Sequence, residues 1–311
     1  MVTLESLQRF FASPVRGFLR QGLGAGSPGD HDAVEDRMPV ELDNLERWAL
    51  GDRMLARALA GQDYESVCNA ELTRGLLPPS GLGYAAIRDV TSQVNGLYSA
   101  SAADRQEPPT TVDVTVDVVV DGTPCRLTGV VPDVRGDRVV RVGFGSLSVK
   151  HRWRAWLDLL ALGASHPERS WSTATYGWVK RSGSAEVSRM GGVDDPVGLL
   201  TGLVGLYRRG LREPLPMPPR TAHRLAECRL HHRSEYWPIR REWDHDDNAV
   251  VPGEAAAPEH VRVYGSRAPV DVLLTDARDD DPGPRSERSR LARLACFLWN
   301  PVFEHERVGN A

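Results

Sequence analysis

Lysine is almost absent from this chain of 311 residues, since Lys150 and Lys180 are the only lysines among its 38 basic side chains. Arginine pairs well with phosphate, but codon composition explains such a bias equally well, so the excess identifies no function by itself. The sequence also lacks any apolar run near the ~18 residues of a membrane-spanning helix. The residues after Met1 are charged and amphipathic, unlike a signal peptide. We therefore expect a cytoplasmic protein without membrane contacts.

Close cysteine pairs and nucleotide-binding glycine motifs are missing as well. The cysteines stand far apart in the sequence, which excludes short zinc and redox motifs and predicts reduced thiols at Cys68, Cys125, Cys228 and Cys296. No Gly-x-x-x-x-Gly-Lys-Ser/Thr occurs, so the chain does not bind ATP through a phosphate loop. Gly143-Phe144-Gly145 lacks the rest of a dinucleotide fingerprint and indicates a turn.

Positive charge is concentrated in the middle of the chain, although the formal net charge is -4. Residues 151–241 carry 15 basic and 8 acidic side chains, a net charge of +7, whereas residues 1–150 carry 15 and 20, and residues 242–311 carry 8 and 14. A basic island between acidic flanks predicts an anionic partner on one face of the molecule.

The hydrophobic pattern predicts an α/β fold with a mixed sheet flanked by helices. Thr111–Val120 alternates valine with polar residues and precedes Asp121-Gly122, a strong hairpin signal. Further strands are expected over Arg126–Val131, Arg138–Val142, Ser172–Val179 and Val261–Tyr264. Apolar residues at helical spacing predict helices over 4–19 with a break at Pro14, and over 42–59, 84–98, 153–162, 197–211 and 291–298.

We expect one continuous domain with three portions. These are an N-terminal helical portion over residues 1–110, an α/β core over 111–215, and a C-terminal extension over 216–311. Gly22–Asp36 is expected to form a loop because it is rich in glycine, aspartate and serine.

Aromatic residues are interleaved with the arginines of the basic island. Cations that meet the backbone and rings that stack on bases are what single-stranded nucleic acid binding requires. Trp153, Trp156 and Trp178 follow apolar patterns and are expected in the core. Tyr236 and Trp237 lie in a polar stretch that we expect to be irregular, so they are the better candidates for exposed rings.

Several segments resemble the C-terminal region of the RecC family, the gamma subunits of exodeoxyribonuclease V (RecBCD). The resemblance rests on residues 4–19 (LESLQRFFASPVRGFL), 45–52 (LERWALGD), 75–78 (GLLP) with 81–83 (GLG), and 207–211 (YRRGL) with 214–216 (PLP). These segments occur in family order and at plausible spacing, from about residue 3 to the end of the chain.

The resemblance implies a PD-(D/E)xK, restriction-endonuclease-like fold that has lost its activity. Where active relatives carry Gly-x-x-Asp-x-x-Asp, residues 129–135 read GVVPDVR, so Pro132 and Arg135 replace the two acids. Asp133 is one residue away from Pro132, the position of the first acid. Because neighbouring side chains in a strand face opposite sides of the sheet, we expect Asp133 to face away from the side of that acid, so that it cannot replace it.

The other family positions are altered too. Asp-x-Lys of active relatives corresponds to Arg141-Val142-Gly143, the helical histidine to Leu55 and the glutamine of the next helix to Arg152. An arginine at a metal position repels the cation, so we expect no metal and no catalysis. Ser13 replaces the cysteine of iron–sulfur relatives. We expect no cofactor in this domain, with Mg²⁺ and ATP used by partner subunits.

The resemblance thus implies a subunit that binds DNA, parts and guides its strands, and docks RecB-like beta and RecD-like alpha subunits during double-strand break repair. We expect DNA contacts from Arg141, Arg152, Arg154, Arg208, Arg209, Arg233, Tyr236, Trp237, Arg240 and Arg241. Two other functions remain open. One is an active Mg²⁺-dependent nuclease that uses Asp113, Asp117 and Asp133; the other is a pure docking scaffold whose basic face includes Arg208 and Arg209.

Overall fold

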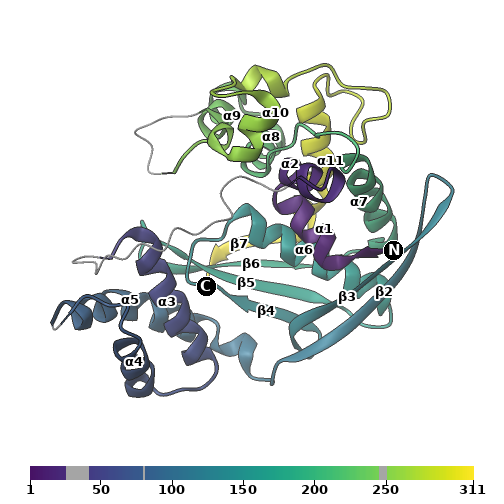
Figure 1. The fold of residues 1–311 in the computed structure, drawn as a ribbon. Helices are drawn as coiled ribbons and strands as arrows, with labels where there is room; N and C mark the ends of the chain where they lie inside the picture. The colour runs from purple at the N-terminus through teal and green to yellow at the C-terminus, as the bar shows by residue number, and fades with distance from the viewer. Residues whose placement is uncertain (26–41, 80, 245–250) are drawn as a thin grey trace.

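A mixed sheet organises the computed structural model, which describes residues 1–25, 42–79, 81–244 and 251–311. In these ranges the sheet has seven strands, β1 (Val2–Thr3), β2 (Thr110–Val120), β3 (Thr123–Arg135), β4 (Arg138–Val142), β5 (Ser172–Val179), β6 (Ser184–Gly191) and β7 (Glu306–Asn310). Their order is β1-β3-β4-β5-β6-β7, and β2 pairs with β3. Helices pack on both faces of this sheet (Figure 1).

The helices form two groups. The first comprises α1 (Leu4–Ala12), α2 (Pro14–Gly17), α6 (Val149–Ser165), α7 (Pro196–Gly210), α8 (Pro219–Leu230), α9 (Tyr236–Trp243), α10 (Pro258–Tyr264) and α11 (Arg290–His305). The second, which we call the helical layer, comprises α3 (Asn44–Leu59), α4 (Tyr64–Thr73) and α5 (Gly81–Ala100). Short turns of helix are η1 (Phe18–Gly22), η2 (Ala102–Arg105), η3 (Glu254–Ala256) and η4 (Val270–Leu273).

The predicted hairpin is confirmed. Strands β2 and β3 pair antiparallel over almost their whole length. Asp121 and Gly122 both have positive φ, 50° and 72°, which is the backbone of a type I′ turn that matches the twist of the strands. The hairpin extends beyond the rest of the sheet (Figure 1).

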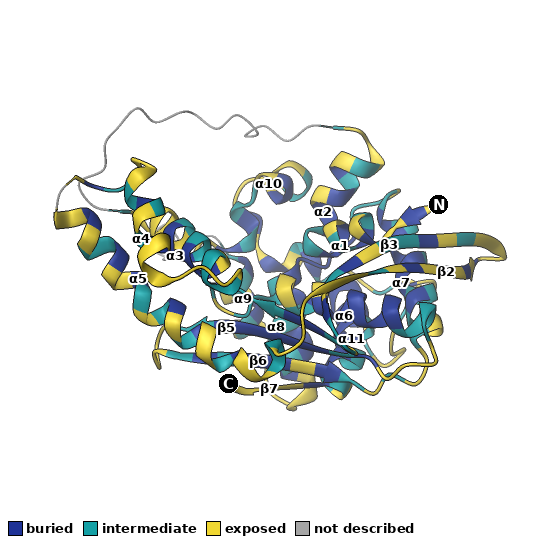
Figure 2. Cartoon of the chain, turned by 90° about the horizontal axis from the view of Figure 1, so that it is seen from below, coloured by how far each residue is buried: buried dark blue, intermediate teal, exposed yellow. Residues whose placement is uncertain are grey.

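Helix α6 lies at the centre of the fold, where it connects the parallel strands β4 and β5. Ser148 caps the helix, and Trp153 and Trp156 are buried as predicted. Figure 2 shows α6 as mostly buried, whereas α3, α4 and α5 carry stripes of exposed and buried residues.

The sheet separates two hydrophobic cores. Along β4, Val139 belongs to the first core, with α1, α6, α7 and α11. Its neighbour Val140 belongs to the second, with Leu50 and Met54 of α3 and Ile87 of α5. Because side chains alternate along a strand, odd positions of β4 face the first core and even positions face the helical layer.

Most predicted elements are confirmed, including the helix break at Pro14 and the closing helix. The strand predicted over Val261–Tyr264 is wrong, because Pro258 at the first helical position starts α10 there. The stretch containing Tyr236 is helical rather than irregular. Residues 26–36 of the predicted loop lie outside the described residues. No helix in the described part of the chain is long and apolar enough to cross a bilayer.

Candidate nucleic-acid interface

Arg141 of β4 lies near two carboxylates, Asp133 of β3 and Asp158 of α6, and Asp158 also contacts the amide of Gln8 of α1. We call this group the Arg141 junction. Arg141 Nη1 lies 2.5 Å from Oδ2 of Asp158 on α6. Gln8 of α1 donates from Nε2 to Asp158 Oδ1 at 2.6 Å. Asp133 Oδ2 lies 3.9 Å from Arg141 Nε. One guanidinium therefore lies where two carboxylates converge.

Arg141 and Asp158 are largely closed to solvent, whereas the side chain of Asp133 is 53% exposed. The side chain of Arg141 is 15% exposed and that of Asp158 is 1% exposed. Burial raises the pKa of Asp158, and the charge of Arg141 and the hydrogen bond from Gln8 offset this only in part. Arg141 is thus the counter-charge of a buried carboxylate rather than a free cation.

The orientation of Asp133 differs from the prediction. Val131 and Val134 both face the first core, although strict alternation would put residues three apart on opposite faces. The pairing of β2 with β3 shifts between Thr110 and Val112, and Asp133 has φ of 62°. This β-bulge re-aims the side chain of Asp133 toward Arg141.

The other degenerate positions do not gather around Arg141. Leu55 is buried in the second core, on the opposite face of the sheet. Arg135 pairs with Arg138 and therefore also faces the side of the helical layer, away from Arg141. On that side its Nη1 donates to Arg105 O at 3.1 Å. Pro132 lies in the bulge and is half-buried, and the N–H of Gly143 donates to Tyr176 O at 3.0 Å.

The carboxylates of the nuclease alternative do not converge either. Asp113 and Asp117 lie on the outer face of β2, between valines that point into the first core. Asp117 pairs with Arg126 across the hairpin at 2.7 Å and is 68% exposed. Only Asp133 lies near Arg141. The described residues contain no group of three His, Cys, Asp or Glu side chains that could hold a metal ion.

Arg152 is the centre of a second buried network. Its Nε donates to Glu306 Oε1 at 2.8 Å, and Ser188 Oγ donates to the same oxygen at 2.5 Å. Arg152 Nη1 lies 2.6 Å from His223 Nε2, and its guanidinium covers the ring of Trp299 at 5.3 Å. Burial, followed by the charge of Arg152, lowers the pKa of His223 to about 4. Arg152 therefore links α6 to α8, α11 and β7.

Arg209 is paired with carboxylates as well. Its side chain is 13% exposed and lies 2.5 Å from Glu213, 3.0 Å from Asp281 and 3.4 Å from Asp280. Asp281 also pairs with Arg290 at 3.1 Å. For Arg141, Arg152 and Arg209, contact with phosphate would break ion pairs to buried or half-buried acids, which is costly.

Helix α9 and the turn before it present most of the exposed members of the predicted DNA-binding set. Tyr236 and Trp237 are 40% and 67% exposed, as predicted. Their rings meet edge to face at 5.8 Å, and the guanidinium of Arg240 lies 5.1 Å from the ring of Trp237. Arg233 and Arg241 are exposed beside them in the chain. We call this group the α9 platform.

Two predicted arginines lie outside the α9 platform. Arg154 is exposed on α6, and Arg208 is half-buried near the end of α7. A cleft of about 1010 Å³ lies between α2, the loop before α6, α8 and α10. Its walls carry ion pairs, including Arg16 with Glu259 at 3.1 Å, so the cleft is not a free basic groove.

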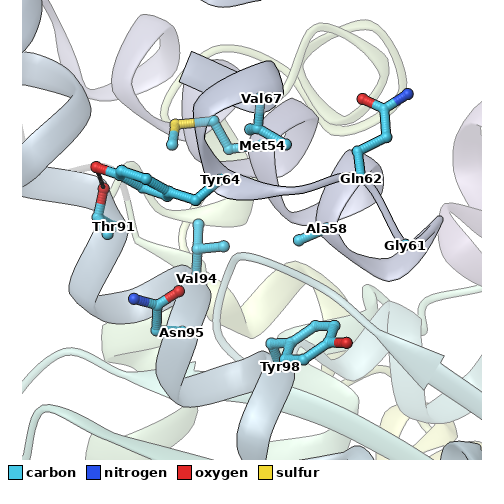
Figure 3. A pocket seen from close by; sticks show the side chains of 10 residues that line it. All are labelled: Met54, Ala58, Gly61, Gln62, Tyr64, Val67, Thr91, Val94, Asn95 and Tyr98. Atoms are coloured by element: carbon cyan, nitrogen blue, oxygen red, sulfur yellow. Dashed lines mark hydrogen bonds between the residues drawn. The ribbon is translucent and has the colours of Figure 1, made fainter.

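The helical layer contains a small pocket of about 240 Å³, which we call the layer pocket (Figure 3). Met54, Val67 and Val94 supply apolar side chains, and the Tyr64 hydroxyl lies 3.3 Å from the hydroxyl of Thr91. Figure 3 shows Tyr98 at another side of the pocket. No local sequence pattern predicts this pocket, because it depends on how α3, α4 and α5 pack together.

Comparison with known proteins agrees with the resemblance seen in the sequence. The family model described as "RecC C-terminal domain" matches residues 1–230. RecBCD enzyme subunit RecC of Mycobacterium tuberculosis is 38% identical over 305 residues, which cover 98% of this chain and 27% of that protein. The subunit of the same name from Mycolicibacterium smegmatis is 38% identical over 308 residues, 98% of this chain and 28% of that protein.

A more distant relative is RecBCD enzyme subunit RecC of Escherichia coli. It is 25% identical over 218 residues, which cover 70% of this chain and 18% of that protein. The chain thus spans about a quarter of the length of the mycobacterial relatives. The family match covers residues 1–230, which is most of the chain. The chain therefore belongs to the RecC C-terminal domain family.

Proposed function

We propose that this domain has a nuclease-like fold without nuclease activity, and that it guides DNA strands and docks the other subunits of a RecBCD enzyme. The observation that supports the loss of activity best is the position of Arg141 between Asp133 and Asp158. Metal-dependent nucleases need acidic oxygens free to bind Mg²⁺. Here the guanidinium neutralises those oxygens and its charge opposes a metal ion.

The order of elements supports the PD-(D/E)xK assignment. A hairpin and a third strand, β2–β3–β4, are followed by α6 and a parallel strand, β5. The altered positions of the nuclease motifs lie in or next to β3, β4 and α6, apart from Leu55, which lies in α3. In this proposal Mg²⁺ and ATP serve the RecB-like beta and RecD-like alpha subunits, and this domain needs neither.

The α9 platform is the surface that fits a DNA strand best. It combines two exposed rings with exposed arginines, and it belongs to the segment that carries the net charge of +7. Rings stack on bases without reading their sequence, and arginines meet the phosphates between them. Such a surface holds a moving strand in place during the processing of double-strand breaks.

Replacing Tyr236 and Trp237 together with alanine tests this surface. Each lost stacking contact costs about 1–3 kcal/mol, so we expect the loss of two to make the assembled complex bind a forked DNA with a single-stranded tail at least about 30-fold more weakly. Fluorescence anisotropy with a labelled fork measures this. Folding should not change, because Trp237 is 67% exposed.

The control is Val119→Ala, which truncates a side chain that is 60% exposed on β2, outside both the α9 platform and the helical layer. It should leave DNA affinity unchanged. Equal affinity of the double variant and the parent would contradict the guiding role. Mg²⁺-dependent cleavage of the labelled strand by this chain alone would instead support the active-nuclease alternative.

A docking role is favoured by the helical layer rather than by Arg208 and Arg209. Exposed large hydrophobic side chains accumulate there at Leu45, Trp48, Tyr64, Leu76, Leu82, Tyr84 and Tyr98. Residues 44–100 carry 5 basic and 6 acidic side chains, so this surface does not attract phosphate. An aromatic-rich surface with a pocket is typical of protein interfaces.

Filling the layer pocket with Ala58→Trp tests the docking role. If an apolar side chain of the beta or alpha subunit anchors there, its loss costs at least about 2 kcal/mol, or about 30-fold in affinity. Co-purification and light scattering with both subunits measure assembly. Val130→Ala, at a residue that is 56% exposed on the hairpin, is the control. Normal assembly of the Ala58→Trp variant would count against docking at this pocket.

A further inference from the structure

Four arginines form a row on the face of the sheet that the helical layer partly covers. Arg135 of β3 pairs directly with Arg138 of β4, and Arg189 of β6 pairs directly with Arg307 of β7. Paired residues point to the same face of a sheet. Arg138 precedes Val139, which faces the first core, so Arg138 faces the other side.

Strand β5 connects the two pairs. Ser172 of β5 lies opposite Arg138 of β4 on one side and opposite Gly191 of β6 on the other. Arg189 is two residues from Gly191, so it shares the face of Ser172 and Arg138. The row therefore crosses from β3 to β7 with a serine in its middle. It lies opposite the face that carries the Arg141 junction.

A buried carboxylate holds the centre of the row in place. Asp104 accepts hydrogen bonds from Arg138, from Arg189 Nη1 at 2.7 Å and from the Tyr176 hydroxyl at 2.6 Å. Arg189 Nη2 also lies 3.0 Å from the Tyr176 hydroxyl. Burial, followed by the bond to Asp104, raises the pKa of Tyr176 to about 12, so the hydroxyl keeps its proton.

The guanidinium groups nevertheless remain accessible. The side chains of Arg138 and Arg189 are 43% and 45% exposed, and Arg307 is exposed. Arg138 Nε donates to Ser172 Oγ at 3.2 Å, and Arg307 Nη1 donates to a backbone carbonyl at 3.0 Å. These contacts fix the arginines before any ligand arrives, which lowers the entropic cost of binding.

A hollow of about 330 Å³ opens beside three of these arginines. Its lining comprises Arg138, Arg189 and Arg307 with Ser172, Thr173, Met190, Gly191, Glu304 and His305. Three arginines face one lining acid, Glu304, and one acid beneath them, Asp104, so a positive charge remains.

The chemistry of the lining favours phosphate over a protein surface. A protein interface needs an apolar or aromatic core, and none of the described lining residues is an exposed large hydrophobic. Arginine and hydroxyl groups are the donors that contact DNA phosphates. Exposed rings for base stacking are absent from the lining residues, so the contact is to the backbone alone.

We propose that Arg138, Arg189 and Arg307, together with Ser172, bind backbone phosphates of DNA on the face of the sheet opposite the Arg141 junction. This inference rests on the proposed strand-guiding function. It adds a second contact that is independent of the α9 platform and reads no sequence.

The test is the salt dependence of DNA binding by the assembled complex with Arg189→Gln and Arg307→Ala combined. Each lost phosphate contact makes the slope of log K against log salt shallower by about 0.7 for single strands and about 0.9 for duplex. For the double variant we expect this slope to become shallower by about 1.4 with a single-stranded oligonucleotide, or by about 1.8 with duplex DNA if the row meets a duplex. Both oligonucleotides are measured.

Arg126→Ala and Arg47→Ala remove exposed arginines from surface ion pairs elsewhere, so they should leave both slopes unchanged. Arg307→Lys keeps the charge and should restore about half of the lost slope when it replaces Arg307→Ala. If the double variant folds poorly, Arg307→Ala alone should still reduce the slope by about 0.7.

Three outcomes overturn the inference. Unchanged slopes in the variants, with a normal effect of the α9 platform variant, would reject the row and leave the proposed function standing. Loss of subunit assembly with unchanged slopes would assign the row to an acidic segment of a partner subunit. Tighter binding of inorganic phosphate by the parent than by the variant, again with unchanged DNA slopes, would assign it to a small anion.

Discussion

Replacing Arg141 with alanine is expected to lower the free energy of unfolding of this chain by about 3–5 kcal/mol. The substitution leaves Asp158, whose side chain is 1% exposed, without its counter-charge. Gln8 remains as a hydrogen-bond donor at 2.6 Å, but an amide does not neutralise a carboxylate. Urea or guanidinium unfolding of the purified chain, followed by circular dichroism, measures the difference.

Two further variants separate charge from packing. Arg141→Met combined with Asp158→Leu removes both charges and should recover most of the loss, because apolar replacements of buried ion pairs are often neutral or stabilising. Glu5→Gln breaks the exposed pair of Glu5 with Arg9, whose side chains are 77% and 63% exposed, and should cost at most about 1 kcal/mol. A small loss for Arg141→Ala would show that Asp158 is not held by Arg141.

The loss in the Arg141→Ala variant should depend on pH in a defined direction. The pKa of Asp158 is raised above its ordinary value of 3.8 by burial, and removal of Arg141 raises it further. A carboxyl with a raised pKa in the folded state destabilises that state as pH rises through the folded pKa. The difference between variant and parent should therefore be largest at neutral pH and shrink toward about pH 4.

Local sequence signals predicted the parts of the fold that depend on neighbouring residues. Asp121-Gly122 fixed the hairpin because both residues adopt positive φ. The apolar spacing of Trp153 and Trp156 identified α6. The prediction of a strand over Val261–Tyr264 was wrong because it relied on the β-branched residues in this segment, whereas the helix observed there depends on Pro258 at its start.

The site was less predictable, because its residues meet only through the fold. Alternation placed Asp133 on the wrong face, since the bulge that re-aims it is set by pairing with β2 rather than by the sequence of β3 alone. Asp158 did carry a signal that could have been used. Residues 153–162 are apolar except for the exposed Arg154 and for Asp158, which is the only acid among them. A buried acid in a helix requires a partner.

The arginines of this chain perform two physically different tasks. Arg141, Arg152 and Arg209 balance buried or half-buried carboxylates and bind elements together. Arg233, Arg241 and Arg307 are exposed and can meet a phosphate without breaking a buried pair. Arginine counts and charge totals do not distinguish these tasks, because burial and pairing decide between them.

Replacing Glu306 with alanine is the second change for which we expect a large effect, a loss of about 3–5 kcal/mol in the free energy of unfolding. Glu306 is the buried partner of Arg152 and also accepts a hydrogen bond from Ser188 at 2.5 Å. Without it, Arg152 is a buried cation beside His223, whose pKa of about 4 already reflects burial and that charge. His223 cannot serve as a counter-charge, because it is neutral or positive at every pH.

The effect should be concentrated at the end of the chain. Glu306 begins β7, which pairs with β6 from Met190 to Glu186, so the amides of β7 should exchange with solvent faster than those of β2 and β3. Hydrogen exchange with mass spectrometry measures both. Glu304→Ala, at an exposed acid two residues earlier, is the control and should change neither stability nor exchange. If the two variants behaved alike, the network around Arg152 would not be what holds β7 against α6, α8 and α11.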